Sequence, residues 1–301
     1  MVNQPYPLHW ETLSASARGA NKQRNQDWYT AEGCGTQADP LVLAVADGHG
    51  SARHARSDVG ARRAVDLFAA HAREFAAFTN VDGLGGTRSL SWLMNYARDV
   101  MPRRLVSEWQ RNVLGHWQRQ DELDEGSSGA VTAPPTDGQK LLLYGATLIG
   151  AVLTPRLFAA WQLGDGELTV IEHDGRVEQP LAPAEAEIGD ETESLCSHEA
   201  WRLVRMHWAP IVERDRMPRL IALSTDGLSK SFAADEGFVE FMTGLDTRCS
   251  EGGLESVQTV LPEWLAKAAQ YSGDDTTMAA GRRPEQDTES AHAGRQTTER
   301  Q

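Results

Sequence analysis

The sequence predicts an α+β fold in which mainly antiparallel sheets are covered by helices. Apolar runs typical of buried strands fall into two groups, within residues 8–46 and 140–229, and two long helical patterns lie between the groups. Grouped strands indicate antiparallel sheets, whereas strict alternation of strands and helices would indicate a doubly wound parallel sheet. With 301 residues, 40% of them hydrophobic, the chain is long enough for one large domain with a sizeable core.

The first half of the chain is expected to hold three strands and then two helices. The strands are predicted at residues 8–19, 27–33 and 41–46. In residues 51–78 and 88–119, large apolar side chains recur at three- and four-residue steps, as on one face of a helix, and Pro102 is expected to kink the second helix. Residues 120–139 are acidic and then rich in Gly, Ser and Pro, which predicts a mobile surface loop.

The second half is expected to return to strands. These are predicted at residues 140–155, 156–166, 168–179 and 219–229. Residues 180–218 are irregular, with prolines that include Pro183, Pro210 and Pro218, and are predicted to form a flap-like segment. A helix is expected over 253–271 and a short strand over 273–281. Residues 282–301 hold no large apolar side chain and are expected to be disordered, so the predicted domain spans residues 1–281.

Composition excludes several classes of protein. The formal net charge of −14 argues against nucleic acid as the main partner, because phosphate backbones are bound by Lys/Arg surfaces. No apolar stretch approaches the roughly 18 residues of a membrane span, and the N-terminus lacks the features of a secretion signal. Cys34, Cys196 and Cys249 are odd in number and far apart, which indicates reduced thiols in a cytoplasmic protein.

Several acidic residues stand at the ends of predicted strands. Asp47, Asp165 and Asp226 each follow an apolar run and precede glycine, and Asp274-Asp275 stands just before a short strand. Asp-Gly is also a common turn dipeptide, so each pair alone is compatible with a simple turn. If the strand ends lie side by side, however, the carboxylates converge and repel, and a bound cation would relieve the repulsion. An all-oxygen ligand set favours Mg²⁺ or Mn²⁺ over Zn²⁺.

Six short motifs occur in a characteristic order: "NQD" (25–27), "VADGHG" (45–50), "GATL" (145–148), "LGDGEL" (163–168), "STDGL" (224–228) and "GDDTT" (273–277). Together they resemble the metal-dependent protein phosphatases, the protein phosphatase 2C-like serine/threonine phosphatases, over residues 14–281. The resemblance implies a four-layer α-β-β-α sandwich with two central, mainly antiparallel sheets. It also implies an enzyme that hydrolyses phosphoserine or phosphothreonine in proteins with two Mg²⁺ or Mn²⁺ ions.

The resemblance further implies a role for each metal-binding position. Asp47 would bridge the two ions, and the carbonyl of Gly48 would bind one of them. Asp226 and Asp274 would hold the other ion, and Asp165 together with Asp226 would form a weaker third site. Two such ions can share a water, lower its pKa and direct the hydroxide at phosphorus in line with the leaving group.

Three further positions would act on water or substrate. By the resemblance, Asp27 would contact metal-bound water. His49 is suited to protonate the leaving Ser or Thr oxygen, with a purely structural role in its loop as the alternative. Lys22 falls where the family has an arginine that clamps the substrate phosphate, and Lys lacks the bidentate guanidinium fork. Arg24, two residues on, is a second candidate for this clamp.

Two other functions are compatible with parts of the sequence. Cys196 and Arg202 have the Cys-x₅-Arg spacing of cysteine-dependent phosphatases, although the segment lacks glycines for a phosphate cradle. The missing arginine would also suit a non-catalytic phosphoprotein-binding regulatory module of the same fold. The expected partners are a phosphoserine or phosphothreonine protein and, as a further candidate, a cognate serine/threonine kinase, with no nucleic acid and no membrane.

Overall fold

The computed structural model describes residues 9–79, 89–124, 134–182, 193–213 and 217–284. Its strands form two five-stranded sheets in which every pairing is antiparallel. The first sheet has the order β1 (Glu11–Ala17), β10 (Thr276–Arg282), β9 (Leu220–Ser224), β6 (Glu167–Ile171) and β7 (Val177–Glu178). The second sheet has the order β2 (Trp28–Glu32), β3 (Leu41–Ala46), β4 (Leu148–Thr154), β5 (Leu157–Leu163) and β8 (Arg205–Pro210).

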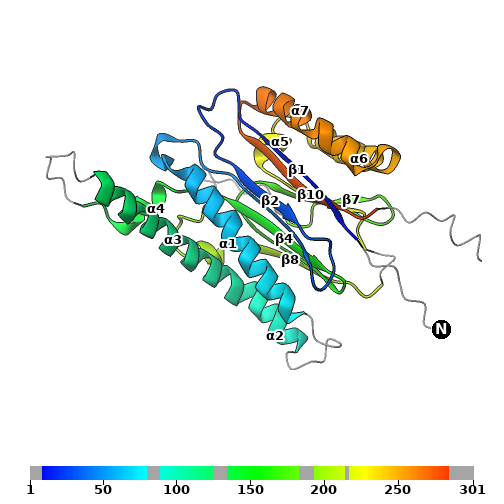
Figure 1. The fold of residues 1–301 in the computed structure, drawn as a ribbon, viewed down its shortest axis with the longest axis horizontal. Coiled ribbons are helices and arrows are strands. Elements are labelled where there is room, and N and C mark those ends of the chain that lie inside the picture. Colours follow the sequence, from blue (N-terminus) through cyan, green and yellow to red (C-terminus); the bar gives the residue numbers. More distant parts are fainter. Residues whose placement is uncertain (1–8, 80–88, 125–133, 183–192, 214–216, 285–301) are drawn as a thin grey trace, which may run out of the picture.

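Helices cover the outer face of each sheet (Figure 1). The second sheet is covered by α1 (Ser57–Phe78) and α3 (Met101–Asp124), and α2 (Leu90–Asn95) continues into α3 through a π-helical segment at Tyr96–Val100. The first sheet is covered by α6 (Asp235–Gly252) and α7 (Leu254–Ser272). Short helices α4 (Asp137–Leu142) and α5 (Asp226–Ser229) lie in connections, and 3₁₀ turns occur at Ala52–His54 and Ala200–Arg202. No described helix combines the length and the apolar character of a membrane span.

Three separate apolar cores hold the layers together. Phe68 of α1 and Trp109 of α3 are fully buried against the second sheet. Ile149 and Leu223 belong to the core between the two sheets, and Leu261 of α7 lies in the core under the first sheet. Three cores between successive layers define a four-layer α-β-β-α sandwich, so the predicted fold class is confirmed.

The prediction of a strand beginning at residue 140 is wrong for its first part. Residues Asp137–Leu142 form α4, and β4 begins only at Leu148. Thr136 caps this helix through a reciprocal capping box with Gln139, a start signal that outweighs the apolar run after it. At the other end of the predicted loop 120–139, α3 continues to Asp124, and residues 125–133 lie outside the described part of the chain.

The flap-like segment predicted at 180–218 is in part regular structure. Arg205–Pro210 forms β8, which pairs with β5 at the edge of the second sheet. Its side chains are half-buried rather than alternately buried and exposed, so the period-2 signal is weak. Residues 183–192 and 214–216 of the predicted flap lie outside the described residues. Helix α6 occupies a stretch for which the sequence predicted no element.

The C-terminal boundary of the domain lies beyond the predicted residue 281. Arg282, assigned to the tail, is the last residue of β10 and is buried. Its Nε lies 3.1 Å from Oδ1 of the buried Asp246 on α6, whose Oδ2 lies 2.8 Å from Nη2 of Arg219. This ion pair connects the end of β10 to helix α6. Residues 285–301 of the predicted tail 282–301 lie outside the described residues.

Candidate metal and catalytic site

Two of the predicted acids lie at one end of the second sheet. Strand β3 ends at Ala46, immediately before Asp47, and β2 begins at Trp28, immediately after Asp27. Because Trp28 pairs with Ala46 in the antiparallel ladder, Asp27 and Asp47 emerge side by side. Thr147, just before β4, binds Asp47 from the other side: its amide donates to the Asp47 carbonyl at 2.9 Å, and its Oγ1 accepts from the Asp47 amide at 3.1 Å.

Two more acids lie at the corresponding end of the first sheet. Strand β9 ends at Ser224, two residues before Asp226, and Ser224 pairs with Met278 of β10. Asp274 stands just before β10 begins, so antiparallel pairing brings it to the same end as Asp226. Asp165 lies in the tight connection through which the chain passes from β5 in the second sheet to β6 in the first.

Hydrogen bonds join the two sheets at this end. Thr225 Oγ1 donates to Asp27 Oδ2 at 2.9 Å and accepts from the Thr277 amide at 3.0 Å. One hydroxyl thus ties an acid of the second sheet to the backbone of the first. Because Thr225 directly precedes Asp226, this contact brings the strand ends that carry Asp27 and Asp226 together.

The electrostatics of Asp47 reflect this convergence. Burial raises the pKa of Asp47 well above its ordinary value, and the charges of Asp27, Asp226 and Asp274 raise it further. The positive charge of the nearby Lys22 lowers the pKa of Asp47. Asp47 thus lies at the centre of a cluster of negative charge.

Asp27 and Asp226 are themselves strongly perturbed. The pKa of Asp27 is raised to about 7. Burial is the main cause, and hydrogen bonds involving Thr277 and Thr225 offset part of its effect. The pKa of Asp226 is raised to about 6, chiefly by burial and then by the charge of Asp165, while Lys230 lowers it. Strongly perturbed carboxyl groups that lie together mark a candidate functional site.

The donor set fits a hard divalent cation. Asp27 and Asp226 are both 5% exposed, and in each the Oδ1 atom is buried without a hydrogen-bond partner. A buried, unpartnered carboxylate oxygen is costly, and coordination to a cation would satisfy it. As the described side chains lie, no group of three or more acidic, His or Cys residues is close enough to hold a metal ion, so binding would require the acids to draw together.

Of the two candidates for the phosphate clamp, Lys22 lies among the acids. Its Nζ is 2.7 Å from Asp274 Oδ1, and its side chain is only 17% exposed. Arg24 points elsewhere: its Nη2 lies 3.0 Å from Asp58 Oδ1 and donates to the Ala55 carbonyl at 2.5 Å, near the start of α1. The geometry therefore favours Lys22.

Asp275 stabilises a loop of the site, a role that the sequence did not reveal. It is 1% exposed, and its two carboxylate oxygens accept hydrogen bonds from the backbone amides of Gly19 and Gln26, each at 2.8 Å. Burial raises the pKa of Asp275, and these two amides oppose the shift. The carboxylate thus holds both ends of the loop that presents Lys22 and leads into Asp27.

Replacing Asp275 by alanine should lower the free energy of unfolding by about 3 kcal/mol, because two buried amides lose their acceptor. Denaturant titration of the two proteins measures the difference. Asp275→Asn retains one carbonyl acceptor and should lose less. A change below about 0.5 kcal/mol in the alanine variant, the size of an ordinary surface substitution, would show that the loop does not depend on this carboxylate.

His49 lies in the loop after Asp47, beside a second imidazole. Its amide donates to the Gly145 carbonyl at 3.1 Å, and its ring centroid is 4.8 Å from that of His54. Burial, followed by the charge of His54, lowers the pKa of His49 to about 4, while Asp165 raises it. The ring is therefore neutral near pH 7. A Cβ on Gly145 would lie 2.7 Å from the His49 ring, so this close packing requires glycine.

Gly48 follows the central acid in a position that excludes any side chain. A Cβ there would lie 2.5 Å from the Gln26 carbonyl oxygen and 2.9 Å from the Ser57 backbone. Its backbone forms an isolated antiparallel bridge with Ala146. The glycine of the "DGHG" motif is therefore needed for close backbone packing, in addition to the predicted approach of its carbonyl to a cation.

Several residues that shape the site received no role from the sequence alone. Thr147 binds the backbone of Asp47, and Thr225 binds the carboxylate of Asp27. Both belong to motifs that carried the resemblance, "GATL" and "STDGL", so a signal was present without an assigned function. Lys230, whose Nζ pairs with Asp226 Oδ2, lies just outside its motif and gave no such signal.

The structure counts against a thiolate mechanism at Cys196. Burial raises the pKa of this thiol, and its Sγ contacts Ser194 Oγ at 3.2 Å. Arg202 pairs with Glu199 at 3.0 Å and stacks on Trp201. A reactive cysteine requires an electropositive setting that lowers its pKa, and Cys196 instead packs against the apolar core.

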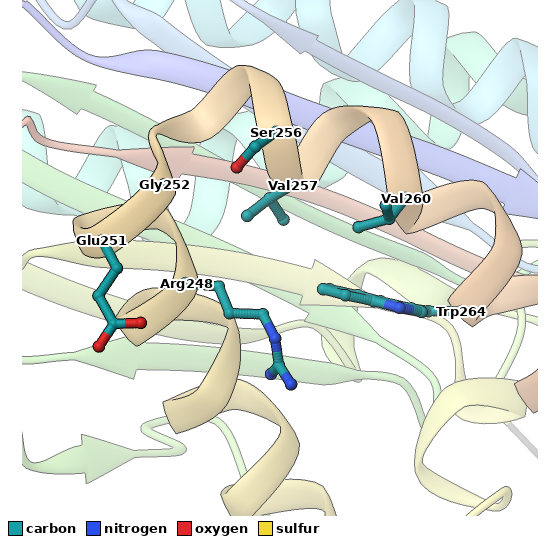
Figure 2. A pocket seen from close by; sticks show the side chains of 7 residues that line it. All are labelled: Arg248, Glu251, Gly252, Ser256, Val257, Val260 and Trp264. Atoms are coloured by element: carbon teal, nitrogen blue, oxygen red, sulfur yellow. The ribbon is translucent and has the colours of Figure 1, made fainter.

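An open groove of about 260 Å³ between α6 and α7 is separate from the acidic cluster (Figure 2). Arg248 and Trp264 line it, with the guanidinium 5.3 Å from the ring centroid. None of the predicted site residues contributes to this groove. The better candidate for the active site is therefore the strand-end cluster, the group of acids formed by Asp27, Asp47, Asp165, Asp226 and Asp274.

Comparison with known proteins places the chain in a family. The sequence profile of the family described as Protein phosphatase 2C matches residues 16–266. The chain thus belongs to the protein phosphatase 2C family, as its motifs predicted. No curated protein matches the chain in sequence.

Solved structures share this architecture at low sequence identity. A bacterial serine phosphatase is 14% identical, with 92% of this chain and 100% of that chain covered and a TM-score of 0.56. Stp1 from Staphylococcus aureus, a serine/threonine phosphatase, is 15% identical over 91% of this chain and 95% of its own, with a TM-score of 0.56. The catalytic domain of the phosphatase PstP, solved in complex with two manganese ions, is 19% identical over 92% and 99%, with a TM-score of 0.55.

Proposed function

We propose that this protein is a metal-dependent protein serine/threonine phosphatase that uses Mg²⁺ or Mn²⁺. The observation that supports this most directly is the electrostatic coupling of Asp47 with Asp27, Asp226 and Asp274, which come from two sheets. In Asp27 and Asp226, the buried Oδ1 atom also lacks a hydrogen-bond partner. Family membership supports the same chemistry, and one family relative of the same fold was solved with two manganese ions.

The proposed roles follow the expected ligand set. Asp47, the Gly48 carbonyl, Asp226 and Asp274 would hold two ions, with Asp165 adding a weaker third site. Bound ions would supply a nucleophilic water at neutral pH and neutralise charge on the phosphoryl oxygens. These residues all belong to the strand-end cluster described above, which gives the assignment its structural support.

Three side chains would act on water and substrate. Asp27, whose Oδ2 is held by Thr225, is positioned to orient water through its remaining oxygen. Lys22 would contact the phosphate, for which it would have to leave Asp274. His49 would deliver a proton to the leaving oxygen of Ser or Thr. The enzyme is proposed to act in the cytoplasm, where Cys34, Cys196 and Cys249 would stay reduced.

Removal of divalent cations tests the proposal. The purified protein should hydrolyse a phosphoserine peptide in the presence of Mn²⁺, and excess EDTA should reduce the rate to the uncatalysed background. Adding Mn²⁺ back beyond the chelator should restore activity. A thiol-blocking reagent should leave the rate unchanged, because Cys196 has no part in the reaction.

Two results would replace the proposal by another function. Hydrolysis that survives EDTA and is lost on thiol blocking would indicate the Cys196 mechanism. Binding of a phosphopeptide without turnover, at any concentration of Mg²⁺ or Mn²⁺ tried, would indicate the regulatory module. Phosphate release, measured in parallel with peptide binding by calorimetry, distinguishes all three.

A further inference from the structure

Helix α5 places a lysine directly on one of the proposed metal ligands. The helix is a single turn, Asp226–Ser229, and Lys230 follows it. Four residues is one helical turn, so Asp226 and Lys230 lie on the same face. The Lys230 amide donates to the Asp226 carbonyl at 2.9 Å, and its Nζ pairs with Asp226 Oδ2.

This pairing differs from an ordinary surface ion pair because its acidic partner, Asp226, is buried. The side chain of Asp226 is 7% exposed, and its Oδ1 has no hydrogen-bond partner. The lysine side chain is 58% exposed, so its ammonium can move into water by rotation of the aliphatic stem. The pair thus joins a fixed, buried anion to a displaceable cation.

The other lysine of the site, Lys22, is held differently. Its side chain is only 17% exposed and lies in the loop that Asp275 fastens to the protein. Lys230 also interacts electrostatically with Asp165 and Asp274, so its charge reaches other acids of the site besides Asp226. Lys230 is therefore the positive charge that a cation arriving at Asp226 would meet and could displace.

We propose that Lys230 is an internal counter-ion that competes with a divalent cation for Asp226. This inference rests on the proposed function, because it assumes that Asp226 is a metal ligand. The ammonium compensates the buried carboxylate when no divalent cation is bound, and it must move into solvent when one binds. Since two cations near one carboxylate repel, Lys230 lowers the affinity of this site for the metal.

Replacing the ammonium by an uncharged group of similar length tests the competition. Lys230→Met should bind Mn²⁺ about three to ten times more tightly than the unmodified protein in calorimetric titration. The difference should shrink at high salt, because screening weakens the repulsion. Mn²⁺ should also raise the melting temperature of Lys230→Met by more than that of the unmodified protein.

Two variants control for side-chain loss and for charge. Lys230→Arg keeps the positive charge and should bind Mn²⁺ as the unmodified protein does. Lys267→Met removes a lysine from an i,i+4 pair with Glu263, 2.8 Å apart on α7, in which both side chains are more than 60% exposed. It should leave Mn²⁺ affinity unchanged.

Each outcome separates this inference from the proposed function. Equal or weaker Mn²⁺ binding by Lys230→Met, while the unmodified protein binds, overturns the counter-ion role and leaves the phosphatase proposal intact. If Lys230→Met binds Mn²⁺ and the unmodified protein does not, the result supports the counter-ion role, because Lys230 then prevents the metal from binding. If neither protein binds Mn²⁺ at millimolar concentration, both the counter-ion role and the metal-dependent function are overturned.

Discussion

Replacing Asp47 by alanine should lower kcat for a phosphoserine peptide by about 10³-fold or more, because the group expected to bridge both ions is lost. Asp47 lies among Asp27, Asp226 and Asp274, and each of them adds to the electrostatic cost of its charge. Calorimetric titration of the variant should show that binding of Mn²⁺ is lost. Full stoichiometric binding with unchanged affinity would contradict the bridging role.

Two measurements separate this catalytic effect from damage to the fold. Removing a buried acid that repels its neighbours should not lower the melting temperature of the protein measured in EDTA. The matched control is Asp174→Ala, since Asp174 also precedes a glycine but lies in an exposed turn and pairs with Arg176. Its kcat should stay within about twofold of the unmodified protein, as for most surface substitutions.

His49→Gln should lower kcat/KM for the phosphoserine peptide by about 10²-fold or more, the usual contribution of a general acid. The same variant should lose less than about tenfold on p-nitrophenyl phosphate, since nitrophenolate leaves without a proton. The pKa of His49 is about 4, so the acidic form is scarce at neutral pH. The advantage of the unmodified enzyme over His49→Gln should therefore grow as the pH is lowered.

The neighbouring imidazole provides the control. His54 Nδ1 lies 2.5 Å from the Leu142 carbonyl oxygen, and His54→Gln should affect both substrates little. If His49→Gln instead reduces the hydrolysis of both substrates equally, the residue positions its loop and does not donate the proton. Full rate profiles against pH for both substrates decide between these roles.

The strands that carry the acids were easier to predict from the sequence than the connections around them. Asp47 and Asp226 follow buried strands and Asp274 precedes one, which is a pattern visible in the sequence, and antiparallel pairing brings these strand ends together. Helix α4 could not be distinguished from a strand by its leucines, since a short apolar run fits both. The half-buried edge strand β8 lacked a clear period.

The roles of residues that act through their neighbours were beyond the sequence. Asp275 was counted among the acids of the site, and only the structure shows it bound to the amides of Gly19 and Gln26. The choice between Lys22 and Arg24 likewise depended on which side chain reaches the acids. Such assignments require the positions of groups that are distant along the chain.

The buried contact between Arg282 and Asp246 sets the shortest length at which the domain can be produced intact. A chain cut after residue 281, where composition changes, would lack the guanidinium that Asp246 receives from β10. It would also lose the hydrogen bond from the Arg283 amide to the Arg219 carbonyl. Truncations for crystallisation or binding studies should therefore retain residues up to 284, even though residues 282–284 carry none of the proposed chemistry.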